Sequence, residues 1–261
     1  MATEVPSRKK IVQNWLPRYT GMPLDEFGRL VLLTNFFAYV QKFSGMYSAP
    51  IRGIGGPMQA CTNASGITIV NFGIGSPNAA TVMDLLSAVH PEAVLFLGKC
   101  GGLKTSVDLG HFVLPIGAIR GEGTGLDYFP IEIPALPSFR LHALIAEEIV
   151  KRDQDYRTGV VYTTNRRVWE HDEEFRDFLV KMRAIGIDME TATLFIVGHY
   201  NEIPRGALLL VSDVPVIPEG IKTEEMDREV NAKFSSMHLE IGIATMESLK
   251  LSGEKVKHLR Y

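Results

Sequence analysis

The chain has 261 residues with a formal net charge of −3 at pH 7, and 46% of its residues are hydrophobic and 22% charged. These proportions are typical of a soluble globular protein with one large α/β domain or two small ones, and the lack of a long basic run argues against nucleic acid as a partner. Two cysteines outside any CxxC pair, Cys61 and Cys100, exclude a disulfide framework and indicate a reducing, cytoplasmic compartment. The N-terminal residues lack the apolar core of a signal peptide, and no apolar run approaches the ~20 residues of a membrane-spanning helix, so we expect no membrane partner.

Residues 1–29 are polar and interrupted by prolines. We interpret them as an N-terminal arm that packs on the domain or on a neighbouring subunit, with a short amphipathic segment at residues 11–16. A single folded domain would then cover residues 30–261. Within it, residues 44–60 are rich in glycine and proline and predict a loop.

Apolar runs of strand length alternate with helical patterns along this domain. Ser76 would cap the helix that follows the second run, with Pro77 as the first helical residue, and helical spacing recurs at residues 138–152 and 234–244. Ligands of a largely parallel sheet bind outside the carboxyl ends of its strands, so we predict an α/β protein with one pocket at the polar clusters that follow the strands. The predicted strands lie at residues 30–33, 67–72, 94–97, 111–119, 158–162 and 207–211.

Glycine-rich clusters follow three of these runs. Residues 73–75 begin like a dinucleotide-binding turn, but the third glycine is missing, and the two present more simply allow the backbone to approach a small ligand. Residues 98–102 enclose Lys99, which would present a cation and backbone N–H groups to an anion; the alternative is a tight turn with a solvated lysine. Their spacing does not match a nucleoside triphosphate-binding loop. The glycines of residues 120–130 predict a mobile loop that covers a site.

The segment 185–193 carries a signal for chemistry, because a strand-like apolar run ends there in two acids, Asp188 and Glu190. Residues two apart on an extended segment point to the same side, so the two carboxylates would share a face. Two carboxylates at the end of a core strand are costly unless they bind something. The alternative is that they lie at the N-terminus of the helix that follows, where the helix dipole favours acids.

Several segments resemble, in the same order, the motifs of the hexameric nucleoside phosphorylase and nucleosidase superfamily. Residues 188–193 and 211–213 are similar to its signature pair, and residues 98–102 are similar to its glycine loop. The likeness runs from about residue 16 to about residue 250, and it implies a single-domain, three-layer α/β fold with a mixed, largely parallel central sheet, assembled as a homohexamer. Within the superfamily, the segments that resemble the AMP nucleosidase branch are residues 32–36, 71–79, 163–169 and 238–242.

The resemblance implies roles for individual residues. Glu190 would bind the ribose 2′- and 3′-hydroxyls, with Met189 packed on the sugar, and Asp213 would protonate or hydrogen-bond N7 of a purine, which requires the raised pKa that burial supplies. Trp169 would stack on the base, although a lone tryptophan more often belongs to a core, and a Ser-Asp pair alone more often caps a helix. The other substrate-binding residues that the resemblance implies are Asn35, Lys99, Gly101, Thr164, Arg166, Arg167 and Ser212.

Two departures from the phosphorylases of the superfamily bear on the nucleophile. Phe96 and Lys99 stand where those enzymes place an arginine and a serine on inorganic phosphate, which favours water as the nucleophile. Related nucleosidases activate water with a glutamate just after the first strand, but residues 34–43 contain no acid. The candidates to position water are Asn35, Tyr39 and Glu122.

The resemblance therefore implies hydrolysis of the N-glycosidic bond of AMP to adenine and ribose 5-phosphate, with no metal or organic cofactor. The alternatives are a purine nucleoside phosphorylase or another purine nucleosidase and, from a different class, a non-catalytic nucleotide-binding protein. A 5′-phosphate dianion needs cations or several N–H donors. The cationic residues near the predicted strand ends or loops are Arg52, Lys99, Arg166, Arg167 and Lys222.

Overall fold

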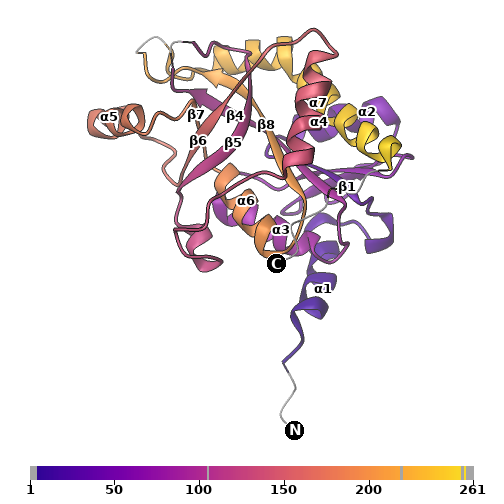
Figure 1. Ribbon diagram of the computed structural model, residues 1–261. Coiled ribbons are helices and arrows are strands. Elements are labelled where there is room, and N and C mark those ends of the chain that lie inside the picture. The colour runs from indigo at the N-terminus through magenta and orange to yellow at the C-terminus, as the bar shows by residue number, and fades with distance from the viewer. Residues whose placement is uncertain (1–4, 105, 218–219, 254–255, 257–261) are drawn as a thin grey trace.

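An eight-stranded sheet forms the centre of the protein in the computed structural model, which describes residues 5–104, 106–217, 220–253 and 256 (Figure 1). Its strands are β1 (Leu30–Thr34), β2 (Gln59–Thr62), β3 (Ile67–Asn71), β4 (Ala93–Gly102), β5 (Phe112–Gly121), β6 (Tyr156–Thr164), β7 (Gly186–Asp188) and β8 (Arg205–Asp213). The strand order is β2-β3-β1-β4-β7-β6-β5-β8, and β4 also pairs with β8, so that β4, β7, β6, β5 and β8 close into a ring. The pairs β2–β3, β4–β7 and β5–β8 are antiparallel, and the other pairs are parallel. The prediction of a mixed, largely parallel sheet is confirmed.

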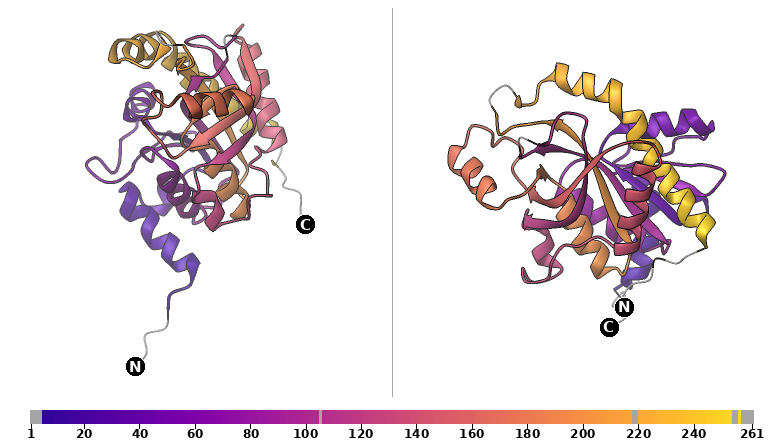
Figure 2. Two further views of the ribbon diagram at one scale, coloured as in Figure 1. Left: turned by 90° about the vertical axis from the view of Figure 1, so that its left-hand side faces the viewer. Right: turned by 45° about the horizontal axis from the view of Figure 1, so that its top comes forward.

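Helices cover both faces of this sheet and make a three-layer molecule (Figures 1 and 2). They are α1 (Arg8–Thr20), α2 (Phe37–Tyr47), α3 (Ser76–Leu86), α4 (Phe139–Val150), α5 (Glu173–Lys181), α6 (Thr191–Tyr200) and α7 (Glu224–Ser252), with short 3₁₀ turns η1 (Leu24–Glu26) and η2 (Thr124–Asp127). Successive residues of a strand point to opposite faces, so Val31 and Leu33 of β1 enter one core, and Leu30 and Leu32 enter the other. Helices α1, α3 and α6 pack on the first core, and α2, α4 and α7 pack on the second.

Each of the six apolar runs predicted as strands forms part of a strand in the structure, namely β1, β3, β4, β5, β6 and β8. The predicted loop at residues 44–60 is wrong at both ends, because α2 continues to Tyr47 and β2 begins at Gln59. Strand β2 has only four residues, pairs with β3 and forms one isolated bridge to Arg52, so its register depends on tertiary contact rather than on a local pattern. The predicted arm contains a helix longer than residues 11–16, and this helix α1 buries Leu16 in the first core.

Strand β4 runs through residues 98–102, so it is longer than the predicted strand at residues 94–97, and the tight turn that the sequence left open as an alternative is not formed there. A Cβ atom on Gly98 would lie 2.3 Å from the Phe96 ring, and glycine is therefore needed there for close packing inside a strand. The pairing of β4 with β8 shifts register just before Gly101, and this bulge brings Gly101 opposite Asp213.

The glycine-rich segment 120–130 contains η2 and packs against α6, so the prediction that it covers the site is wrong for this structure. Glu122 is buried, and its Oε1 accepts hydrogen bonds from Gly125 N at 2.9 Å and from Thr193 Oγ1 at 2.8 Å. The prediction of Ser76 as the cap of α3 is also wrong by one residue, because Gly75 precedes the helix and Ser76 is its first residue.

Candidate active site

A pocket of about 160 Å³ lies at the carboxyl ends of β1, β4, β6, β7 and β8. We call it the strand-end pocket. Its wall brings together every residue that the sequence predicts for the site: Asn35, Lys99, Gly101, Thr164, Arg166, Arg167, Trp169, Met189, Glu190, Ser212 and Asp213. Lys222, one of the predicted cations, also lines it. Arg52 does not belong to this set, and its guanidinium pairs with Glu26 at 3.0 Å on the exposed surface.

The two acids that end β7 occupy different environments. Asp188 accepts hydrogen bonds from Thr163 Oγ1 at 2.7 Å, from Thr191 N at 2.7 Å and from Thr191 Oγ1 at 2.5 Å, with a longer one from Glu190 N at 3.2 Å. It therefore fixes the start of α6, which is the alternative that the sequence left open for both acids. Asp188 lies in the wall of the pocket, but its carboxylate is already engaged by the protein and joins β6, β7 and α6.

Glu190 is the acid that is available to a ligand. It is 2% exposed, and its Oε1 accepts a hydrogen bond from Gly75 N at 2.7 Å, which ties β7 to the turn before α3. The neighbouring Ser76 Oγ donates to Met189 O at 2.7 Å and holds the same connection. Burial, with the negative charge of Asp188, raises the pKa of Glu190 to about 8. An ionised Glu190 is thus costly in the empty pocket.

Asp213 is the second acid of the pocket and ends β8. Its Oδ1 accepts a hydrogen bond from Ser212 Oγ at 2.7 Å, and Lys222 Nζ in turn lies 3.2 Å from Ser212 Oγ. Its Oδ2 lies beside the bulge, where a Cβ atom on Gly101 would approach it to 3.2 Å. Burial raises the pKa of Asp213 and outweighs the Ser212 hydroxyl and the charges of Lys222 and Arg167, which act in the opposite direction.

Lys99 points from β4 toward the N-terminal turn of α7 rather than into solvent. Its side chain is 3% exposed, and its Nζ lies 2.7 Å from Asp227 Oδ1 and 4.5 Å from the centre of the Phe36 ring. Burial lowers the pKa of Lys99, although the hydrogen bond and charge of Asp227 oppose this. The solvated lysine that the sequence left open as an alternative is not what the structure shows.

The opposite wall is formed by the segment between β6 and α5. Arg166 Nη2 pairs with Asp172 at 2.8 Å, and Arg167 Nη1 lies 3.5 Å from Glu170, and both guanidinium groups remain substantially exposed. Trp169 lines the pocket but is only 4% exposed, because it packs edge to face on Phe175 in a small core. Thr164 accepts a hydrogen bond from Arg166 N at 3.0 Å and so shapes the turn.

The three candidates for positioning water are separated by the structure. Asn35 lines the strand-end pocket, where its side chain hydrogen-bonds Glu190 and its buried Oδ1 has no partner among the described residues. Tyr39 is buried on α2, and its hydroxyl lies 2.9 Å from His238 Nδ1. Glu122 is held by η2 and α6, as described above. Only Asn35 of the three lies in the pocket wall.

The sequence did not predict the roles of Phe36 and Glu170 in the wall or the approach of Asp227. Phe36 had a signal, since it is an aromatic residue directly after the first strand and beside Asn35. Asp227 had none, because only the tertiary fold brings the first turn of α7 over the end of β4.

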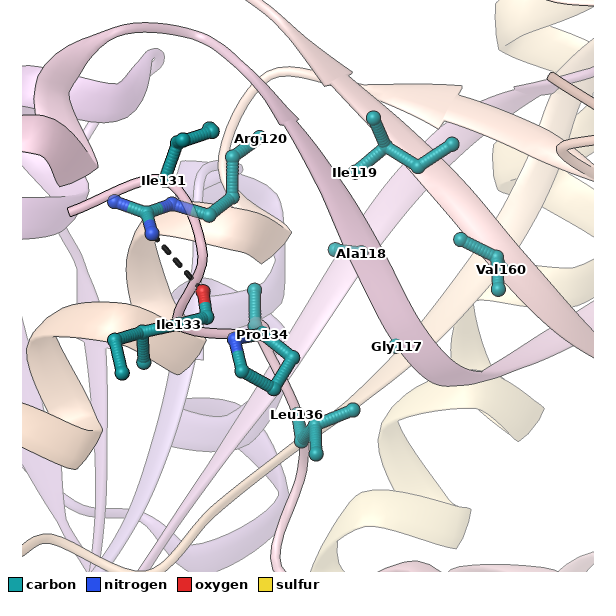
Figure 3. A pocket seen from close by; sticks show the side chains of 10 residues that line it. Gly117, Ala118, Ile119, Arg120, Ile131, Ile133, Pro134, Leu136 and Val160 are labelled. Atoms are coloured by element: carbon teal, nitrogen blue, oxygen red, sulfur yellow. Dashed lines mark hydrogen bonds between the residues drawn. The ribbon is translucent and has the colours of Figure 1, made fainter. Parts of the chain in front are cut away.

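A second concave region, which we call the β5 groove, has a larger volume of about 350 Å³ (Figure 3). Its described wall is aliphatic apart from Arg120, whose guanidinium donates to the carbonyl oxygens of Phe129, Pro130 and Ile133. The remaining side chains of the wall include Ile119, Ile131, Pro134, Leu136 and Val160.

Neither a metal centre nor a membrane segment is found in the described part of the chain. Among those residues, no three His, Cys, Asp or Glu side chains cluster so that they could hold a metal ion. None of the described helices is both long and apolar enough to cross a bilayer.

The fold and the polar pocket define a class of protein, and comparison with known families agrees. Residues 29–242 match the family described as the Phosphorylase superfamily, and the chain belongs to this family. Within it, the chain is 30% identical to the AMP nucleosidase of Escherichia coli K12 over 92% of this chain and 59% of the relative. The chain thus spans about 59% of the length of that curated relative.

Solved structures extend the comparison. The crystal structure of an AMP nucleosidase from Bacteroides thetaiotaomicron is 50% identical and superimposes with a TM-score of 0.84, covering 95% of this chain and 100% of that one. A uridine phosphorylase from Vibrio fischeri is 20% identical with a TM-score of 0.76, covering 87% of this chain and 93% of that one, and this likeness concerns the fold alone.

Proposed function

We propose that the protein hydrolyses the N-glycosidic bond of AMP and releases adenine and ribose 5-phosphate. The observation that carries the proposal is the pairing, in one pocket, of two buried acids with raised pKa values, Glu190 and Asp213. Cleavage of this bond passes through an oxocarbenium-like sugar and a base that departs with its electrons, so it needs one group at each side. The names of the two AMP nucleosidases that the chain resembles support AMP as the substrate.

Asp213 is the proposed general acid. Protonated Oδ2 donates to N7 of the base while the bond from C1′ to N9 breaks, and the electrons of that bond move onto the purine. Ser212 occupies Oδ1 as a donor, so it leaves Oδ2 to carry the proton. Gly101 keeps the approach to this oxygen open, since a Cβ atom there would lie 3.2 Å from it.

Glu190 is proposed to bind the ribose 2′- and 3′-hydroxyls, with Met189 against the sugar. The burial that disfavours its ionised form in the empty pocket also makes that form strongly favoured when positive charge develops at the sugar, because the local dielectric is low. This difference between ground state and transition state is what accelerates a reaction.

Asn35 is proposed to orient the attacking water. Its amide side chain hydrogen-bonds Glu190. Its buried side-chain oxygen, Oδ1, has no partner among the described residues, so it can accept a hydrogen bond from a water molecule. Water adds its oxygen to C1′, and the proton that it releases replaces the one that Asp213 gives to adenine. Phe96 is buried in the core, and Lys99 is paired with Asp227, so neither offers the phosphate contacts expected of a phosphorylase.

Arg166 and Arg167, the exposed cations of the segment between β6 and α5, are proposed to bind the 5′-phosphate. Trp169 and Phe36 are proposed to contact the base. We further infer a cytoplasmic homohexamer in which the arm, residues 1–29, contacts a neighbouring subunit. The two free cysteines of the chain suit a reducing compartment.

The test is release of adenine from AMP in phosphate-free buffer, followed by chromatography, with identification of the sugar product by mass spectrometry. We expect adenine and ribose 5-phosphate, with no increase in rate when inorganic phosphate is added. A requirement for phosphate, with a sugar bisphosphate as product, would instead indicate a phosphorylase. Tight binding of AMP without any cleavage would indicate a non-catalytic nucleotide-binding protein.

A further inference from the structure

Asp227 joins the two lysines that lie on the α7 side of the strand-end pocket. Its Oδ1 lies 2.7 Å from Lys99 Nζ and 3.1 Å from Lys222 Nζ, and its Oδ2 accepts a hydrogen bond from Asn231 Nδ2 at 3.1 Å. The two lysines come from distant segments, β4 and the residues before α7. One carboxylate therefore fixes the distance between two ammonium groups.

A chain of hydrogen bonds leads from this cluster to the proposed general acid. Lys222 Nζ is 3.2 Å from Ser212 Oγ, and Ser212 Oγ donates to Asp213 Oδ1 at 2.7 Å. Lys99 is on the strand that pairs with β8, and its charge and that of Asp213 influence each other. Asp213 thus lies within the influence of both lysines that Asp227 engages.

Burial raises the pKa of Asp213, and the charge of Lys222 in this cluster acts against that rise. Each lysine favours the ionised carboxylate of Asp213, whereas the negative charge of Asp227 disfavours it. Burial of the Lys99 side chain, which is 3% exposed, makes a counter-ion necessary, since an unpaired buried ammonium group is costly. Asp227 supplies that counter-ion and engages Lys222 with the same oxygen.

We propose that Asp227 is a positioning residue that neutralises Lys99 and Lys222 and holds Lys222 on Ser212, so that Asp213 keeps the proton that it gives to the base. This inference rests on the proposed function for its kinetic consequence, but not for its electrostatic one. Burial alone would raise the pKa of Asp227, but its bonds with Lys99 and Lys222 outweigh burial and lower it. Asp227 is therefore ionised in the pH range in which Asp213 is expected to titrate.

Other groups also act on Asp213 and must stay constant in a test. The other described charged and titratable groups that act with Asp213 from the surrounding elements are Lys99 and Cys100 of β4, Arg167 and Glu170 of the segment before α5, and Lys222.

The test is a titration of the Asp213 carboxyl by NMR in protein labelled with ¹³C at aspartate carboxyls, with the signal assigned by its loss in Asp213→Asn. We expect Asp227→Asn to lower the pKa of Asp213 by about one pH unit, because a compensating negative charge is removed nearby. Asp227→Glu should restore most of the wild-type value. Glu224→Gln, an exposed change one turn earlier on α7, is the matched control and should leave it unchanged.

Kinetics give the second readout. We expect the alkaline limb of the kcat profile of Asp227→Asn to move down by about one pH unit, which makes kcat at pH 8 roughly 10-fold lower while KM changes less than about threefold. An unchanged Asp213 titration in folded Asp227→Asn overturns the inference. If that variant does not fold, Lys222→Met must raise the pKa of Asp213, and no rise would overturn it equally. Absence of adenine release by the wild-type protein defeats the proposed function, and the NMR titration still decides the role of Asp227.

Discussion

The β5 groove and the strand-end pocket are both concave, and the larger of the two is not the better site. The groove has about 350 Å³, but its described wall is aliphatic and its Arg120 is committed to three backbone carbonyls. The strand-end pocket has about 160 Å³ and concentrates acids and cations, and the pKa values of two of its buried acids, Glu190 and Asp213, are raised. What separates the two concave regions is therefore the gathering of buried titratable groups rather than the volume.

The contrast between the strand-end pocket and the β5 groove would not hold if Asp213 could be replaced without loss of activity. We expect Asp213→Asn to keep the fold, because its amide oxygen can still accept from Ser212, and to lower kcat on AMP by roughly 10²–10⁴, the usual range for a general acid. Leu136→Ala in the groove is the matched control and should leave kcat within about twofold. Similar turnover in Asp213→Asn and in the wild-type protein would remove Asp213 from the mechanism.

A second prediction concerns the free energy that ionisation of the buried Glu190 costs the folded protein. The pKa of Glu190 is raised to about 8 in the folded protein, so the folded state binds the Glu190 proton more tightly than the unfolded state does. The stability that this group contributes is fully present below its ordinary value of 4.5 and is lost as the pH rises through about 8. Glu190→Gln should therefore equal the wild type in stability near pH 4.5 and exceed it by about 5 kcal/mol at pH 8.5, or roughly 10–20 °C in Tm.

Thermal unfolding followed across pH 4.5 to 8.5 measures this difference, and Asp188→Asn is the informative neighbour. Asp188 accepts bonds from Thr163 and Thr191, and an amide has only one acceptor oxygen, so we expect that variant to be less stable at every pH. A Tm of Glu190→Gln that followed the wild-type curve at every pH would contradict the assignment of a costly buried charge at this position.

The smallest expected effect distinguishes the two walls of the strand-end pocket. Arg166 and Arg167 are exposed and pair with Asp172 and Glu170, and Arg166 also lies over the Phe175 ring, whereas Lys99 is buried. We expect AMP to be preferred over adenosine by at least ~100-fold in kcat/KM, about 2.7 kcal/mol. Replacing both arginines with alanine should reduce that preference about 10-fold and affect adenosine cleavage less. Steady-state kinetics on both substrates decide this, and equal rates on AMP and adenosine in the unmodified protein would leave a general purine nucleosidase.

The sheet and the members of the site were predictable from the sequence, because a buried strand that ends in a polar cluster leaves a local pattern. Ser212 and Asp213 end β8 and Glu190 follows β7, and the closed ring of the mixed sheet brings the carboxyl ends of both strands to one pocket. Residues 98–102 were predicted to follow a strand rather than to belong to it, because glycine before a bulge looks like glycine after a strand end. Gly98 is needed inside the strand because the Phe96 ring lies against it, and the sequence does not show this contact.

The different environments of Asp188 and Glu190 could not be predicted from the local sequence pattern. Their spacing predicts a shared face, but which carboxylate is available depends on Thr163 from β6 and on Gly75 from the turn before α3. The role of Asp227 depends in the same way on where α7 starts relative to β4. Contacts between segments that are distant in the chain decide these points, and a single sequence carries little information about them.

The ring of strands also sets the time at which the pocket is assembled during synthesis of the chain. Strand β4 (Ala93–Gly102) closes onto β8 (Arg205–Asp213), so the whole of residues 103–204 must be made before these two strands can pair. Contacts of such high sequence separation form late and slowly, because the entropy of closing the intervening loop is lost first. A nascent chain that ends before β8 has the strand with Lys99 but not the acid opposite Gly101. The strand-end pocket is thus one of the last features to appear as the polypeptide emerges and folds.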